Sequence, residues 1–174
     1  MKEYKLLFTG PTGAGKTTAI SAVSEVPPVI TDVLNTDESV SKEQTTVGLD
    51  FGEITLENGD KLRLFGTPGQ TRFSFMWKIL SKGAIGLIIL LDNASRDPVA
   101  DLKRYMDGFS GLIRDTACVI GVGRLEAGSA CAMDDFAHTV QGYGIVCPII
   151  PVDVRERSQV LVLIDLLLTQ LEHK

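Results

Sequence analysis

The sequence predicts a three-layer α/β domain built on a mostly parallel, six-stranded sheet with one antiparallel hairpin at its edge. Three observations predict this class. The pattern G-x-x-x-x-G-K-T at residues 10–17 lies between a short apolar run and a helix-compatible segment. An Asn58-Gly59 pair separates two strand-like runs, as in a hairpin turn. After that hairpin, apolar runs alternate with helical segments, which is the order of repeated βα units.

Length and composition predict a single domain spanning residues 1–174. The chain has 44% hydrophobic and 22% charged residues, which is typical of an ordinary globular protein and excludes a disordered one. The net charge of -5 argues against a general nucleic-acid binder, whose binding face would give a basic excess. The three cysteines form no C-x-x-C pair, which favours free thiols. We therefore expect a cytoplasmic protein with no signal peptide and no stable membrane anchor.

The first half of the chain is expected to begin with a βα unit. A strand at residues 4–9 runs into the glycine-rich loop, and a helix at 16–26 ends at the Pro27-Pro28 pair. Residues 29–44 are polar without periodicity, so they predict a long loop of the kind that carries function. The hairpin then joins strands at residues 46–56 and 60–65.

In the second half, residues 84–91 are continuously apolar, which predicts a central strand covered on both faces. Further strands are expected at 117–122 and 145–152, and helices at 71–82, 98–109, 131–141 and 156–171. Ligands of such sheets bind at the carboxyl ends of the strands. The loops at 10–17, 66–70 and 123–127 should therefore converge on one site.

The glycine-rich loop has the chemistry of a phosphate-binding P-loop. Its glycines let backbone N–H groups turn inward around a phosphate, Lys16 brings a positive charge, and the Thr17 hydroxyl can ligate Mg²⁺. The residues expected to contact the nucleotide here are Gly10, Thr12, Gly13, Ala14, Gly15, Lys16, Thr17 and Thr18.

Three motifs in order resemble those of the Ras superfamily of small GTPases, over essentially the whole chain. They are the P-loop, Thr45-Thr46-Val47-Gly48-Leu49-Asp50-Phe51, and Gly66-Thr67-Pro68-Gly69-Gln70. The second is similar to the switch I of Rab proteins, and the third to the switch II of bacterial Ras-like proteins of the MglA and conservon kinds. The resemblance implies a Ras-like G domain that binds GTP and GDP with Mg²⁺ and hydrolyses GTP slowly, as a molecular switch. It also implies a roadblock-type regulatory protein docking over the two switches.

The switch motifs contain the expected γ-phosphate sensors. Thr46 can give its hydroxyl to Mg²⁺ and its N–H to the terminal phosphate, with Thr45 as the alternative. Gly69 would offer an N–H to the γ-phosphate, and Gln70 would orient the attacking water. Gln70 and Lys16 are thus the predicted catalytic residues, and Thr17 and Thr46 the predicted metal ligands. The competing interpretations are a β-branched strand opener at Thr46 and a surface residue at Gln70.

Three departures from the family pattern affect the metal and the base, the first at position 66 and the other two in the base motifs. Gly66 stands where an acidic residue opens the D-x-x-G motif, and Asp32, Asp37 or Asp50 could supply a carboxylate instead. The base-reading N-K-x-D motif is replaced by residues 123–126. The preference for guanine over adenine therefore stays open. The alternative functions are a P-loop ATPase and a pseudo-GTPase scaffold with weak or no hydrolysis.

The residues expected at the base follow the last two predicted strands. Arg124 can stack on a flat ring and Glu126 keeps an acceptor for guanine donors, although the two could also be a solvated pair. The third base motif, S-A-K in many members, is replaced by Val152, Asp153 and Val154, followed by an arginine.

The segment after Gln70 crowds Phe73, Phe75, Met76 and Trp77 together. Adjacent positions of a helix lie about 100° apart, so these side chains cannot all face one core stripe. Some are expected to be exposed as anchors for a partner, the alternative being core residues on an irregular helix.

Overall fold

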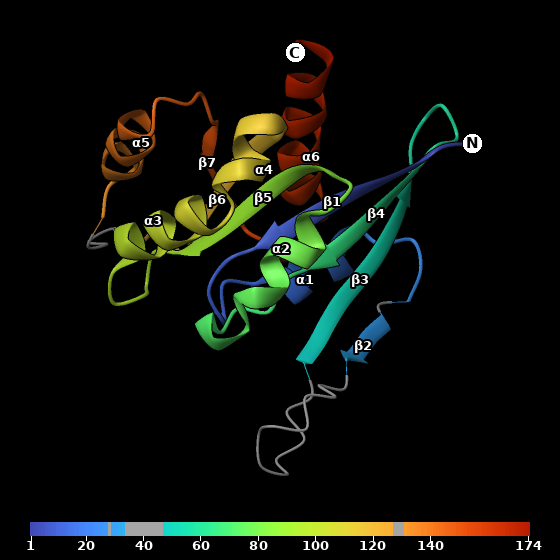
Figure 1. The fold of residues 1–174 in the computed structure, drawn as a ribbon, viewed down its shortest axis with the longest axis horizontal. Helices are drawn as coiled ribbons and strands as arrows, with labels where there is room; N and C mark the ends of the chain where they lie inside the picture. The colour runs from blue at the N-terminus through green and yellow to red at the C-terminus, as the bar shows by residue number, and fades with distance from the viewer. Residues whose placement is uncertain (28, 34–46, 127–130) are drawn as a thin grey trace.

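The predicted fold class is confirmed by a computed structural model, which describes residues 1–27, 29–33, 47–126 and 131–174. Helices cover both faces of one sheet (Figure 1). In this part of the chain the strand order is β2-β3-β4-β1-β5-β6-β7. The strands are β1 (Glu3–Thr9), β2 (Val29–Val33), β3 (Val47–Thr55), β4 (Lys61–Gly66), β5 (Ala84–Asp92), β6 (Ala117–Gly123) and β7 (Ile149–Pro151). The helices are α1 (Lys16–Val23), η1 (Thr71–Phe73), α2 (Phe75–Ser81), α3 (Pro98–Gly108), α4 (Ser110–Asp115), α5 (Met133–Gly142) and α6 (Arg157–Glu172).

The centre of the sheet is parallel, and its side chains build two separate apolar clusters. Strand β1 pairs in parallel with β4 and β5. Successive residues of a strand point to opposite faces, so Leu6 and Phe8 join the cluster under α1 and α6, whereas Leu7 joins the cluster under α2 to α5. The continuous apolar run predicted as the central strand is β5, and its burial on both faces explains the lack of alternation.

One predicted loop is wrong in part. Residues 29–44 were expected to form a loop, but Val29–Val33 is a strand that pairs antiparallel with β3. The sheet of the described residues therefore has seven strands and two antiparallel pairs, in place of six strands and one pair. An edge strand has a neighbour on one side only, so it does not need the apolar alternation that predicts an inner strand. Residues 34–44 of the predicted loop lie outside the described residues.

The predicted hairpin is confirmed. Strands β3 and β4 pair antiparallel, and Gly59 in the turn has φ 81°, which glycine adopts without strain. Their register places Asp50 directly opposite Gly66. Both positions lie at the end of the hairpin that meets the P-loop, because Gly66 also pairs with Phe8 of β1.

The predicted helix at 71–82 is interrupted, since η1 ends at Phe73 and α2 begins at Phe75. Phe73 and Trp77 are buried, whereas Phe75 is 57% exposed and Ile79 is 61% exposed. The expectation that these bulky side chains do not share one core stripe is therefore confirmed. No helix in the described segments is long and apolar enough to span a membrane.

Trp77 packs α2 against Tyr105 of α3 and stacks on Phe109, which directly follows α3. Its ring centroid lies 5.0 Å from that of Tyr105 and 5.1 Å from that of Phe109, and its indole Nε1 donates to the Pro68 carbonyl at 3.3 Å. A Cβ on Gly108 would lie 2.5 Å from the indole ring. Only glycine at position 108 lets the indole pack this closely against α3.

We expect Gly108→Ala to lower the free energy of unfolding by about 2 kcal/mol, because the added methyl overlaps a rigid ring and forces the packing apart. Urea unfolding followed by circular dichroism measures the change. Gly111→Ala in α4 is the matched control, since a Cβ there meets nothing within 4 Å. The control should leave stability unchanged or raise it, as alanine favours helix. Equal losses in both variants would contradict the packing argument.

Candidate functional site

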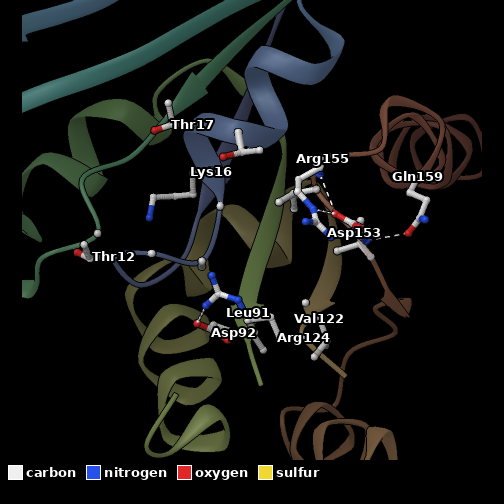
Figure 2. Close-up of a pocket in the computed structure, with 18 of the residues that line it drawn as sticks. Thr12, Lys16, Thr17, Leu91, Asp92, Val122, Arg124, Asp153, Arg155 and Gln159 are labelled. Carbon is white, nitrogen blue, oxygen red and sulfur yellow. Dashed lines mark hydrogen bonds and ion pairs between the residues drawn. The ribbon is translucent and has the colours of Figure 1, made fainter. Parts of the chain in front are cut away.

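A cavity of about 950 Å³ lies where β1, β5 and β6 end. It is lined by the P-loop, the start of α1, residues 67–69, the ends of β5 and β6, and the segment after β7. Figure 2 shows Lys16 and Thr17 on one side of it, and Asp153, Arg155 and Gln159 together across from them. The predicted convergence of the three loops is confirmed, because each contributes lining residues.

Most of the predicted nucleotide-binding residues lie together in this lining. They are Thr12, Gly13, Ala14, Gly15, Lys16, Thr17, Thr18, Gly69, Arg124, Glu126, Val152, Asp153 and Val154. Gly10 is not among the lining residues and lies instead against β5. Thr46, its alternative Thr45, and Asp37 lie outside the described residues.

The P-loop owes its path to backbone conformations that favour glycine. Gly10 has φ 146°, and a Cβ there would lie 2.1 Å from the Leu90 carbonyl oxygen. Gly15 has φ 97°, and a Cβ there would lie 2.6 Å from Val154 Cγ2. At Gly10 the backbone of the loop therefore lies directly against β5. At Gly15 the loop lies directly against the segment after β7. Helix α1 begins at Lys16, so its first N–H groups face the cavity side of the loop.

Lys16 is the buried cation of the site. Its residue is only 8% exposed, and its Nζ donates to the carbonyls of Gly10 at 2.7 Å and Pro11 at 2.9 Å. Burial lowers the pKa of Lys16 to about 8, while the nearby Asp50 carboxylate acts in the opposite direction. Two neutral carbonyls compensate an ammonium less well than an anion does, so a phosphate would stabilise the charged form.

The lowered pKa of Lys16 makes stability depend on pH. The unfolded lysine titrates near 10.4, so between about pH 8 and that value the unfolded chain holds a proton that the folded chain has lost. Stability due to Lys16 should therefore rise across this window, by about 3 kcal/mol in total. Urea unfolding of the nucleotide-free protein in EDTA, from pH 7 to 10.5, measures it. Lys16→Met should lack this rise, and parallel curves for the two proteins would contradict the assignment.

Thr17 and Asp50 meet at the edge of the cavity. Thr17 Oγ1 donates to Asp50 Oδ2 at 2.6 Å. Asp50, one of the three acidic residues that the sequence left open, therefore lies beside the predicted metal ligand Thr17. The side chains of Asp32 and Asp37 lie outside the described part of the structure. No group of three or more His, Cys, Asp or Glu side chains suited to a metal occurs among the described residues. A hydroxyl and a carboxylate nevertheless fit Mg²⁺, which takes few protein oxygens and keeps waters and phosphate oxygens.

Gly69 packs directly on the P-loop. A Cβ at position 69 would lie 2.5 Å from the Thr12 nitrogen and 2.9 Å from Lys16 Nζ. The Gly69 carbonyl accepts from the buried Tyr105 hydroxyl at 3.1 Å, and burial raises the pKa of Tyr105 to about 12. Gly69 is thus held close to both the P-loop backbone and the Lys16 ammonium.

Gln70 is exposed and is not one of the cavity-lining residues. Its Oε1 accepts from Arg72 Nε at 2.7 Å, and the Arg72 guanidinium lies 4.7 Å from the centre of the Phe73 ring. The side chain that was predicted to orient water is therefore held on the neighbouring arginine in this conformation.

Two ion pairs line the cavity, one where β5 and β6 end and one in the segment after β7. Arg124 has φ 56°, and its Nη1 donates to Asp92 Oδ2. Arg155 donates to Asp153 through Nε at 2.9 Å and Nη2 at 2.8 Å, and these bonds lower the pKa of Asp153 to about 2. The Asp153 N–H donates to Gln159 Oε1 at 2.7 Å. These contacts fix the positions of polar groups that line the cavity.

Asp92 and Gln159 were not predicted from the sequence. Asp92 directly follows the apolar run at 84–91, so a polar residue at the carboxyl end of a buried strand was an available signal. Gln159 lies in the first turn of α6, and nothing in the local pattern distinguishes it from a surface residue.

The chain is similar in sequence to Ras-related and GTP-binding proteins. Ras-related protein Rab-13 of Rattus norvegicus is 30% identical over 134 residues, which are 75% of this chain and 58% of that protein. GTP-binding protein ypt1 of Schizosaccharomyces pombe is 30% identical over 135 residues, 76% of this chain and 59% of that protein. An uncharacterized protein of Methanocaldococcus jannaschii is 30% identical over 90 residues, 52% of this chain and 51% of that protein. The matches thus span less than two thirds of these relatives. No protein-family model matches the chain.

Proposed function

Sequence similarity to Rab and Ypt proteins supports placing the chain in the Ras superfamily, and from that premise we propose that it is a molecular switch that binds GTP and GDP with Mg²⁺ and slowly hydrolyses GTP. The observation that carries the proposal is the close approach of Gly69 to the P-loop, where an added Cβ would lie 2.5 Å from the Thr12 nitrogen and 2.9 Å from Lys16 Nζ, because it brings the segment that would sense a third phosphate against the phosphate-binding loop. The G-T-P-G-Q sequence of that segment supports the finer assignment to the bacterial Ras-like type.

The phosphates would be bound by Lys16 and by the N–H groups of residues 13–18. Mg²⁺, held by Thr17 and Thr46, would neutralise charge on the β- and γ-phosphates. Gly69 would donate its N–H to the γ-phosphate, while its carbonyl stays on Tyr105. Gln70 would leave Arg72 and orient the attacking water for in-line displacement. Because this rearrangement must come first, unassisted hydrolysis should be slow.

The base would lie between the two ion pairs. Arg124, held by Asp92, would cover one face of the ring, and Glu126 would accept from the guanine donors. A partner of the roadblock type would dock over the switches. The exposed apolar side chains of Phe75 and Ile79 on α2 support a docking surface there.

Competition binding tests the proposed ligand. We expect GDP and GTP to displace a fluorescent GDP at least ~10-fold more effectively than ADP and ATP, since Glu126 offers an acceptor that adenine cannot use in the same way. Mass spectrometry of the nucleotide that co-purifies gives an independent readout. Equal affinity for both bases would favour the P-loop ATPase, and no binding at all would favour the scaffold.

Phosphate release tests the proposed reaction. Gln70→Leu should reduce single-turnover GTP hydrolysis by ~10-fold or more while leaving GTP affinity unchanged, because the glutamine acts on water and not on the nucleotide. Gln141→Leu is a control for the same substitution, on an exposed position of α5. Equal rates in the parent protein and Gln70→Leu would contradict the catalytic role.

A further inference from the structure

A carboxylate stands beside Thr17 although position 66 has none. Asp50 and Gly66 are opposite each other in the antiparallel pairing of β3 and β4, so their side-chain positions share one face of the sheet. A Cβ built on Gly66 would lie 3.0 Å from Asp50 Cβ and 3.0 Å from Asp50 Oδ2. The Asp50 side chain therefore occupies the space that a side chain at position 66 would need.

The Asp50 carboxylate is directed at the phosphate-binding groups. One oxygen accepts from the Thr17 hydroxyl, the residue lines the cavity, and its negative charge acts on the buried Lys16 ammonium. A hydroxyl that donates its proton to Asp50 keeps its oxygen lone pairs for a cation.

We infer that Asp50 is the carboxylate of the Mg²⁺ site, supplied from β3 in place of an acidic residue at position 66. Asp50 would orient the Thr17 hydroxyl through Oδ2 and offer Oδ1 to the water shell of the cation. Outer-shell carboxylates of this kind set metal affinity by fixing the ligands and adding negative charge. The inference rests on the proposed function, since the cation would arrive with the nucleotide phosphates.

The geometry also predicts which substitutions relocate the carboxylate. Gly66→Asp alone should crowd two carboxylates at the 3.0 Å contact and give no gain. Asp50→Gly removes the group, and Asp50→Gly combined with Gly66→Asp moves it across the strand pair onto the same face. The double variant therefore tests the position of the charge and not the identity of the residue that carries it.

The experiment measures release of a fluorescent GDP as a function of free Mg²⁺, together with Mn²⁺ binding to the GDP complex by electron paramagnetic resonance. The Mg²⁺ midpoint is the free Mg²⁺ concentration at which the slowing of GDP release is half complete. Asp50→Asn is expected to raise this midpoint ~10-fold or more, and to weaken Mn²⁺ binding by a similar factor. GDP affinity in EDTA should change less than threefold. The double variant should return the Mg²⁺ midpoint to within about threefold of the parent value. Glu57→Gln, which removes the same charge from the exposed hairpin turn, should leave the midpoint unchanged.

The outcomes separate this inference from the proposed function. If the parent protein binds GDP in a Mg²⁺-dependent way and Asp50→Asn has the same midpoint, the assignment of Asp50 is wrong and the proposed function stands. If the parent protein shows no guanine-nucleotide binding, the proposed function fails and this inference fails with it. If Asp50→Asn does not fold, as judged by circular dichroism, the double variant decides: recovery of the midpoint supports the relocated carboxylate, and no recovery overturns it.

Discussion

Replacing Gly10 with alanine is expected to destabilise the protein by about 4 kcal/mol, enough to leave a large fraction of a marginal domain unfolded. Two costs add. A Cβ at this position would lie 2.1 Å from the carbonyl oxygen of Leu90. The residue also has φ 146°, a backbone angle that residues other than glycine rarely adopt. Leu90 cannot move away, because it is fully buried in β5 and paired with β6. Urea unfolding followed by circular dichroism measures the loss.

Gly59→Ala is the matched control for the Gly10 prediction. Gly59 also has a positive φ, of 81°, but a Cβ there meets nothing within 4 Å. Its cost should be the conformational strain alone, about 1 kcal/mol. If the two variants lose the same stability, the backbone contact with Leu90 is not what requires glycine at position 10.

Replacing Lys16 with methionine is expected to weaken GDP affinity by ~100-fold or more, which corresponds to about 3 kcal/mol. Methionine keeps an apolar stem of similar length but has no donor for a phosphate. At neutral pH the free protein should not lose stability in the same proportion, because the variant no longer buries an ammonium whose pKa is lowered to about 8. Titration calorimetry with GDP, with and without Mg²⁺, measures the affinity.

Lys5→Met is the control for the Lys16 prediction. Lys5 is on the same strand-and-loop unit, and burial also lowers its pKa, but its amine donates to the Lys82 carbonyl at 3.0 Å, away from the cavity lining. GDP affinity should be unchanged in this variant. Equal weakening in Lys5→Met and Lys16→Met would point to loss of net charge and not to a phosphate contact.

The sequence predicted those parts of the fold and site that depend on local chemistry. The P-loop requires particular residue types in a row, so most of residues 10–18 could be placed in the cavity lining from their spacing alone. The Asn58-Gly59 turn determines the β3–β4 hairpin for the same reason. The apolar run of β5 was informative because a strand buried on both faces needs no polar positions.

What the sequence did not predict depends on register and on neighbours distant in the chain. The position of Asp50 beside Thr17 and opposite Gly66 depends on how β3 pairs with β4, and no pattern within one strand contains that register. Strand β2 is defined by its neighbour β3 and not by its own composition. The hydrogen bond from the Asp153 N–H to Gln159 joins a loop to a helix turn, so neither residue alone signals it.

The packing of Trp77 against α3 has an optical consequence. The chain contains a single tryptophan, so all of its indole emission comes from the segment that follows Gln70. The ring is 4% exposed, and its N–H is bonded to the carbonyl of Pro68, immediately before Gly69. A movement that draws Gly69 towards a phosphate would also move the Pro68 carbonyl, and so would either shift the indole ring or break its hydrogen bond. The protein therefore carries its own spectroscopic reporter of that movement, with no label attached.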